Sequence, residues 1–179
     1  PGKGETIADR IEAGTFLCGA VITRGRVKVT HMVPEHIMAV LNVFKEIGCD
    51  VAIGDSWVEV DARNKSLKPI SVTTLPYPGF PTDLQAPLMA TLASIEGNSL
   101  IQDTIYHDRF THIAELKRLG ADIQLNGNTA TIIGGKSLEG ADVMASDLRA
   151  SAALVLSGLI AEGETTISRI YHLDRGYED

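Results

Sequence analysis

The chain has 179 residues, of which 44% are hydrophobic and 22% charged, a balance that is ordinary for one globular domain with a buried core. Its 16 basic and 23 acidic residues give a formal net charge of −7, which disfavours a nucleic-acid or anionic-membrane partner because both attract positive charge. No apolar run approaches the length of a membrane span, no signal peptide is visible, and the two cysteines fit a reducing compartment, so we expect a cytoplasmic protein.

Three segments of the chain share one pattern, an aspartate followed by small and apolar residues up to a glycine. The aspartates are Asp9, Asp83 and Asp147. Helices that are apolar on every side are buried on every side. We therefore predict three helices at the centre of the fold. The predicted central helices are 11–22, 84–95 and 148–161.

A short β-rich stretch follows each predicted central helix, and the first two stretches lead into an amphipathic helix. Apolar side chains recur at helical spacing from Ile37 to Ile47 and from Ile113 to Leu119, and Gly48 and Gly120 end these helices. The pair Asn126-Gly127 is a strong turn signal, so a β-hairpin follows the second helix, and a weaker signal predicts one after the first. The predicted strands that follow the central helices are 26–31, 99–106 and 165–171.

The recurring unit is a buried helix, a strand, a surface helix and a hairpin. Units 1–64, 65–135 and an incomplete 136–179 predict an α/β fold with three sheets around three inner helices and surface helices outside the sheets. The connector 65–81, rich in proline, is expected to be extended and loop-like, and the second connector, 134–145, is shorter. Because the third unit stops before its surface helix, we expect a fragment of a larger protein whose exposed apolar surface permits self-association.

Two roles are open for the repeated aspartates. Aspartate is a favoured N-cap, which accepts hydrogen bonds from the free N–H groups of the first turn and contributes about 1 kcal/mol. Alternatively, a carboxylate held at the start of a helix is well placed as a general base. Asp83 favours the second role most, because Pro78 to Thr82 form a rigid approach to it.

Arginines form a second group of candidates. Arg149 falls in the first turn of an otherwise apolar helix, where an unpaired charge is costly. A guanidinium at a helix N-terminus makes a site for phosphate or carboxylate, and a salt bridge with Asp147 or Glu178 is the alternative. Arg109 and Arg175 hold corresponding places after two predicted strands, and an ion pair with a neighbouring unit is the alternative for each.

Other chemistries lack a sequence motif. The five histidines show no metal-ligand spacing, and Cys18, inside an apolar run, is expected to be a buried inert thiol. The chain has no Walker loop, no dinucleotide-binding glycine motif and no nucleophile elbow. The patterns alone therefore predict an α/β domain with an anion site, without a metal or a cofactor.

Four segments carry a more specific signal: Asp9 to Phe16, Phe80 to Ala86, Asp147 to Ala152 and Ile170 to Glu178. In this order, and over nearly the whole chain, they closely resemble the bacterial UDP-N-acetylglucosamine enolpyruvyl transferases. The resemblance implies an inside-out α/β barrel of the enolpyruvyl transferase type. It also implies that this chain holds most of one of the two domains that close on the substrates.

The resemblance further implies the reaction of the whole enzyme. The enolpyruvyl group of phosphoenolpyruvate moves to the 3-hydroxyl of UDP-N-acetylglucosamine and phosphate is released. This reaction is the first committed step of peptidoglycan synthesis, and the resemblance therefore implies a role in cell wall biogenesis, cell shape, the cell cycle and cell division. The family's reactive cysteine, and a lysine and an arginine that grip phosphoenolpyruvate, belong to the other domain. Neither Cys18 nor Cys49 matches that cysteine, so the chain alone is expected to be inactive.

Individual residues take their expected roles from the same resemblance. Asp83 is matched to the base for the sugar hydroxyl, and Ile105 to a backbone contact with the UDP-sugar. Arg175 is matched to an arginine that moves onto phosphoenolpyruvate on closure. Asp147 and Arg149 are matched to residues that line the cleft and position the substrates.

Two alternatives remain open from the sequence. One is a non-catalytic interaction or regulatory module that keeps the fold without its chemistry. The other is the shikimate-pathway enolpyruvyl transferase, which would bind shikimate 3-phosphate rather than a UDP-sugar.

Overall fold

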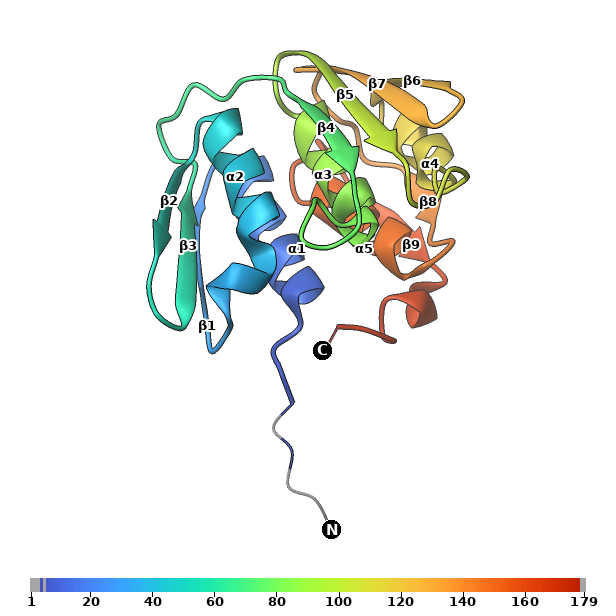
Figure 1. Ribbon diagram of the computed structural model, residues 1–179. Helices are drawn as coiled ribbons and strands as arrows, with labels where there is room; N and C mark the ends of the chain where they lie inside the picture. The colour runs from blue at the N-terminus through green and yellow to red at the C-terminus, as the bar shows by residue number, and fades with distance from the viewer. Residues whose placement is uncertain (1–3, 5, 178–179) are drawn as a thin grey trace.

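The computed structural model describes residue 4 and residues 6–177, and three helices form its centre (Figure 1). They are α1 (Arg10–Ile22), α3 (Gln85–Ala93) and α5 (Leu148–Gly158). The three helices pack against one another, and every residue of α3 is buried, as its apolar sequence requires. Gly14 of α1 permits a close approach, because a Cβ there would overlap the side chain of Leu84. The prediction of three central helices is confirmed; burial on every side holds for α3, whereas α1 and α5 each keep an exposed apolar side chain, Phe16 and Val155.

An antiparallel sheet in the order β1-β3-β2 packs against α1. Its strands are β1 (Arg26–Thr30), β2 (Asp50–Ile53) and β3 (Trp57–Asp61). Val58 and Val60 on the inner face are fully buried. On the outer face Lys28 is exposed, with its Nζ 3.8 Å from the centre of the Trp57 ring. The predicted strand 26–31 and the first hairpin are confirmed.

A second sheet has the order β4-β5-β7-β6, with β4 and β5 parallel and the other pairs antiparallel. Its strands are β4 (Ser71–Thr74), β5 (Gly97–Asp103), β6 (Asp122–Asn126) and β7 (Thr129–Gly134). The predicted hairpin turns at Gly127, whose φ is 57°. The connector 65–81, expected to be extended and loop-like, contains the strand β4, which the sequence did not predict because its partner β5 lies far along the chain.

The third sheet consists, in the described residues, of two parallel strands, β8 (Asp142–Met144) and β9 (Thr166–Ser168). The connector 134–145, for which the sequence predicts no strand, contains β8. The strand predicted over 165–171 ends early, because Arg169 has a left-handed φ of 61° and a 3-10 helix, η3 (Ile170–His172), follows.

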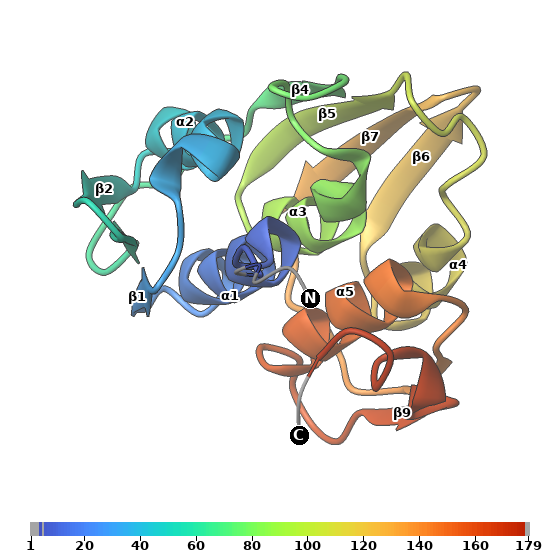
Figure 2. The same ribbon diagram turned by 60° about the horizontal axis from the view of Figure 1, so that its bottom comes forward.

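The predicted amphipathic helices are α2 (Met38–Ile47), preceded by the 3-10 helix η1 (Pro34–Ile37), and α4 (His112–Arg118). Each is followed by a glycine with positive φ, 110° at Gly48 and 92° at Gly120, as predicted. They lie beside the sheets, with α2 between the first sheet and β4 (Figure 2). The outer face of β5 stays exposed at Leu100 and Gln102, so the prediction that helices cover the sheets from outside is wrong.

Apolar side chains are exposed between α1 and α5. Phe16 and Leu159 are 55% and 61% exposed beside a cavity of about 280 Å³. The expected exposed apolar surface is therefore present, whereas self-association stays a prediction. Within the described part of the chain, no helix combines the length and the apolar character needed to cross a membrane.

Candidate functional site

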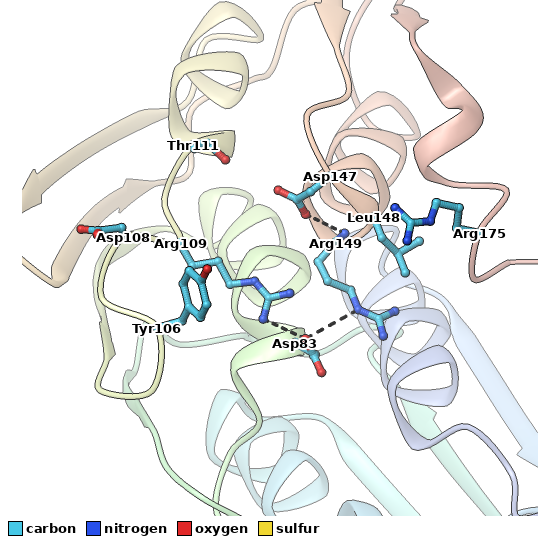
Figure 3. A pocket seen from close by; sticks show the side chains of 9 residues that line it. All are labelled: Asp83, Tyr106, Asp108, Arg109, Thr111, Asp147, Leu148, Arg149 and Arg175. Atoms are coloured by element: carbon cyan, nitrogen blue, oxygen red, sulfur yellow. Dashed lines mark hydrogen bonds and ion pairs between the residues drawn. The ribbon is translucent and has the colours of Figure 1, made fainter.

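The N-terminal ends of α3 and α5 and the loop after β5 surround an open cavity of about 580 Å³ (Figure 3). Four of the five predicted site residues line it: Asp83, Asp147, Arg149 and Arg175. The fifth, Ile105, lines an adjoining cavity of about 150 Å³ that also includes Asp83. The larger cavity is lined by Asp83, Tyr106, Asp108, Arg109, Thr111, Asp147, Leu148, Arg149 and Arg175.

Asp83 lies in the 3-10 helix η2 (Thr82–Leu84), which leads directly into α3. Its side chain is 41% exposed and does not cap α3. Oδ1 instead lies 2.8 Å from Nη1 of Arg109 and 3.9 Å from Nε of Arg149. No described residue donates a hydrogen bond to Oδ2. Capping is therefore wrong as the role of Asp83, and one carboxylate oxygen is held while the other is open.

The other two repeated aspartates are helix caps. Oδ1 of Asp9 accepts hydrogen bonds from the N–H groups of Ile11 and Glu12 at 2.7 and 3.2 Å. Oδ1 of Asp147 accepts from the N–H groups of Arg149 and Ala150, both at 2.9 Å. Three aspartates in one sequence pattern thus have two different roles, because η2 moves Asp83 away from the N-cap position of α3.

Arg149 projects from the first turn of α5 into the cavity, and its side chain is only 14% exposed. Besides its ion pair with Asp83, Nη1 donates to the hydroxyl of Tyr177 at 3.4 Å. That hydroxyl also lies 2.8 Å from Oγ1 of Thr15 on α1. The salt bridge considered with Asp147 is not formed, and Glu178 lies outside the described residues.

Arg109 and Arg175 enter the cavity from opposite sides (Figure 3). Arg175 follows η3 and lies beside Leu148, the first residue of α5. Arg109, on the loop after β5, pairs with Asp83 of the same predicted unit, so the expected pairing with a neighbouring unit is wrong for it. The family resemblance assigned Arg109 no role at the site, although its place after a predicted strand corresponds to that of Arg175.

Asp103, which no sequence pattern marked as a site residue, lies directly behind the site. It ends β5 and is completely buried. Oδ1 accepts hydrogen bonds from Thr74 Oγ1 and from the N–H groups of Ile105 and Tyr106, and Oδ2 accepts from Thr82 Oγ1. Burial alone would raise the pKa of Asp103, but these hydrogen bonds together hold it below its ordinary value.

Other buried titratable groups are outside this constellation. Burial lowers the pKa of His112 to about 4, and burial raises the pKa of Cys18 to about 12 and of Cys49 to about 11. Both thiols are buried and neither lines the cavity, which confirms the prediction for Cys18. In the part of the chain that the structure describes, no group of three or more histidine, cysteine or acidic side chains is placed to hold a metal ion.

Comparison with known proteins identifies proteins whose sequences are similar to this chain. The sequence profile of EPSP synthase (3-phosphoshikimate 1-carboxyvinyltransferase) matches residues 2–179. The UDP-N-acetylglucosamine 1-carboxyvinyltransferase of Hydrogenovibrio crunogenus is 52% identical over 172 residues, which cover 96% of this chain and 41% of the relative. That of Acinetobacter baylyi is 51% identical over 173 residues, 97% of this chain and 41% of the relative. The chain thus spans about two fifths of these relatives.

Solved structures share the fold. The enolpyruvyl transferase NikO from Streptomyces tendae aligns with a TM-score of 0.86 and 29% identity, over 96% of this chain and 41% of that structure. The EPSP synthase from Acinetobacter baumannii aligns with a TM-score of 0.71 and 20% identity, over 99% and 44% of the two chains. The predicted enolpyruvyl transferase fold of mixed α/β class is therefore confirmed.

Proposed function

The chain belongs to the EPSP synthase family, and from this premise we propose that it forms one domain of a UDP-N-acetylglucosamine 1-carboxyvinyltransferase. The observation that carries the proposal is the 52% identity, over 96% of the chain, to a relative of that name. The EPSP synthase structure shares only 20% identity over nearly the same length. This difference favours the UDP-sugar over shikimate 3-phosphate as the acceptor.

In the proposed reaction Asp83 is the base. Its open Oδ2 takes the proton of the sugar 3-hydroxyl while the hydroxyl oxygen bonds to C2 of phosphoenolpyruvate, and the electron pair of the double bond takes up a proton at C3 from an acid that the other domain would supply. The tetrahedral intermediate then returns a C3 proton to that group, the C–H electron pair restores the double bond, and phosphate leaves with the electron pair of its bond to C2. The ion pair with Arg109 supports this role, because it fixes the carboxylate while leaving one oxygen for the substrate.

Arg149 and Arg175 are proposed to hold the phosphate and carboxylate groups of phosphoenolpyruvate. A guanidinium matches both groups with paired N–H donors, and the N-terminus of α5 adds the positive end of its dipole. Asp147 caps that same helix and accepts a hydrogen bond from the N–H of Arg149, which fixes the backbone position of Arg149. Ile105, in the adjoining cavity, is proposed to contact the UDP-sugar through its backbone.

The proposal includes a second domain. The residues that line the larger cavity include three aspartates and three arginines, so their formal charges cancel and cannot by themselves attract an anionic donor. The additional positive charge would come from the family's other domain.

In the same proposal the chain divides into units 1–64, 65–135 and 136–179. The first sheet lies within the first unit and the second sheet within the second unit. The enzyme would then be cytoplasmic and serve peptidoglycan synthesis.

Phosphate release tests the proposed acceptor. The intact protein that contains this chain is mixed with phosphoenolpyruvate and either UDP-N-acetylglucosamine or shikimate 3-phosphate. We expect phosphate only with the UDP-sugar. Release with shikimate 3-phosphate instead would assign the sister activity, and release with neither would favour a non-catalytic module.

A further inference from the structure

Asp103 is, among the described residues, the carboxylate that is completely buried. A buried charge without a cation costs free energy unless hydrogen bonds replace the lost water. Four donors surround Asp103, two hydroxyls and two backbone N–H groups, at 2.7 to 3.0 Å. So complete a set of donors shows that the fold retains an anion at this position.

The donors come from three segments that are far apart in the sequence. Thr74 ends β4, Thr82 begins η2, and Ile105 and Tyr106 belong to the loop after β5. Thr82 directly precedes the proposed base, and its Oγ1 also lies 3.4 Å from Nη1 of Arg109. Asp103 thus connects, through one side chain, the turn that carries Asp83 to the loop that carries Ile105.

The opposite wall of the cavity does not depend on Asp103. Arg149 is held by α5, its cap Asp147 and the hydroxyl of Tyr177, and its contact with Asp83 is a long ion pair, 3.9 Å from Nε to Oδ1. Arg175 lies beyond η3, and neither arginine bonds to Asp103 or to its four donors within the described residues. The site therefore has two walls that are positioned by different parts of the fold.

We propose that Asp103 is a positioning residue that sets the place of Asp83 and Ile105 for the UDP-sugar and leaves the phosphoenolpyruvate arginines unaffected. The proposal rests on the proposed function and adds a residue that acts through others. Asn at this position keeps the shape of the side chain but replaces one acceptor oxygen by a donor, so at least one of the present donors loses its partner.

The test is steady-state kinetics of the intact protein carrying Asp103→Asn. We expect kcat to fall about 100-fold, the effect of a displacement of about 1 Å at the reacting group. KM for the UDP-sugar should rise about tenfold, whereas KM for phosphoenolpyruvate should stay within about twofold, since a lost oriented hydrogen bond affects one substrate only. A role in stability alone would lower the amount of active protein and leave both KM values unchanged, and that result would overturn the proposal.

Ser99→Ala is the matched control. Ser99 lies on the same buried face of β5, and its Oγ accepts a hydrogen bond from the N–H of Ile70, remote from the cavity. This variant should lose stability without a change in either KM. If Asp103→Asn does not fold, Thr82→Val and Thr82→Ser decide: the hydroxyl of serine should restore the KM for the UDP-sugar that valine impairs, and equal KM values in both would overturn the proposal.

Failure of the proposed function has a different signature. In that case the unsubstituted protein would release no phosphate from the two substrates. Failure of the positioning role would instead show in an active unsubstituted protein whose Asp103→Asn variant keeps its KM for the UDP-sugar.

Discussion

Nη1 of Arg109 lies 2.8 Å from Oδ1 of Asp83, and this ion pair gives the candidate site its orientation. The side chains of the pair are 26% and 41% exposed, and exposed ion pairs contribute only about 0–1 kcal/mol to stability. The consequence of the contact is therefore geometric. It fixes one oxygen of Asp83 and leaves the other without a partner among the described residues.

Asp83→Asn should lower kcat of the intact protein by about 10²- to 10⁴-fold, because an amide cannot accept the hydroxyl proton. The free energy of unfolding should change little, since Asp83 caps no helix. Asp108→Asn is the control, as Asp108 lines the same cavity without an ion pair to a described residue. Equal activity of the two variants would remove Asp83 from the chemistry.

Alanine substitutions should separate the three repeated aspartates by stability. Asp9→Ala and Asp147→Ala each remove two hydrogen bonds to a helix N-terminus and should lower the free energy of unfolding by about 1 kcal/mol. Asp83→Ala should change it by less than about 0.5 kcal/mol. Urea unfolding measures all three, with asparagine at positions 9 and 147 as controls that keep the cap. A loss at Asp83 as large as at the other two would contradict its assignment.

Arg109→Lys should reduce kcat about tenfold while the protein stays folded. Lysine keeps the charge but loses the planar guanidinium that holds Asp83 and lies 6.0 Å from the centre of the Tyr106 ring, and such a charge-assisted bond is worth about 1.5 kcal/mol. Arg118→Lys provides the control on α4, where the side chain is 58% exposed and remote from the cavity. Unchanged kcat in both variants would show that the ion pair does not orient the base.

His112 should make stability depend on pH below neutrality. Burial lowers its pKa from 6.5 to about 4, so the unfolded chain binds the proton more tightly. The free energy of unfolding keeps its full value above pH 6.5 and decreases as the pH falls from 6.5 towards 4. The decrease due to His112 is at most about 3 kcal/mol for a pKa shift of this size. Urea unfolding between pH 4 and 7 should show this slope, and His112→Phe should flatten it. An equally steep slope in the variant would assign the effect to other groups.

Much of the fold follows from local patterns in the sequence. The central helices are apolar on all sides, and Gly48 and Gly120 end the amphipathic helices in the left-handed conformation that only glycine adopts easily. Strands β4 and β8 were missed because each is short and is defined by its parallel pairing with a strand beyond a central helix. No local pattern contains that information.

The members of the site could be predicted only where the family resemblance assigned a role to a particular residue. Asp83, Asp147, Arg149 and Arg175 meet around one cavity, and Ile105 lies next to it. Their roles in the reaction remain proposals. The position of Asp83 in η2 rather than at an N-cap depends on tertiary contacts, as does the burial of Asp103. Asp103 falls inside the predicted strand 99–106, and no local pattern distinguishes a buried aspartate there from an exposed one, so the sequence offered no signal for it.

The role of Asp83 can be tested by a crystal structure of the intact protein with UDP-N-acetylglucosamine bound. We predict that the sugar 3-hydroxyl lies within about 2.6–3.2 Å of Oδ2 of Asp83, in the cavity that Arg149 and Arg175 share. A sugar bound with its 3-hydroxyl outside hydrogen-bond reach of Asp83, or on another face of the domain, would contradict it.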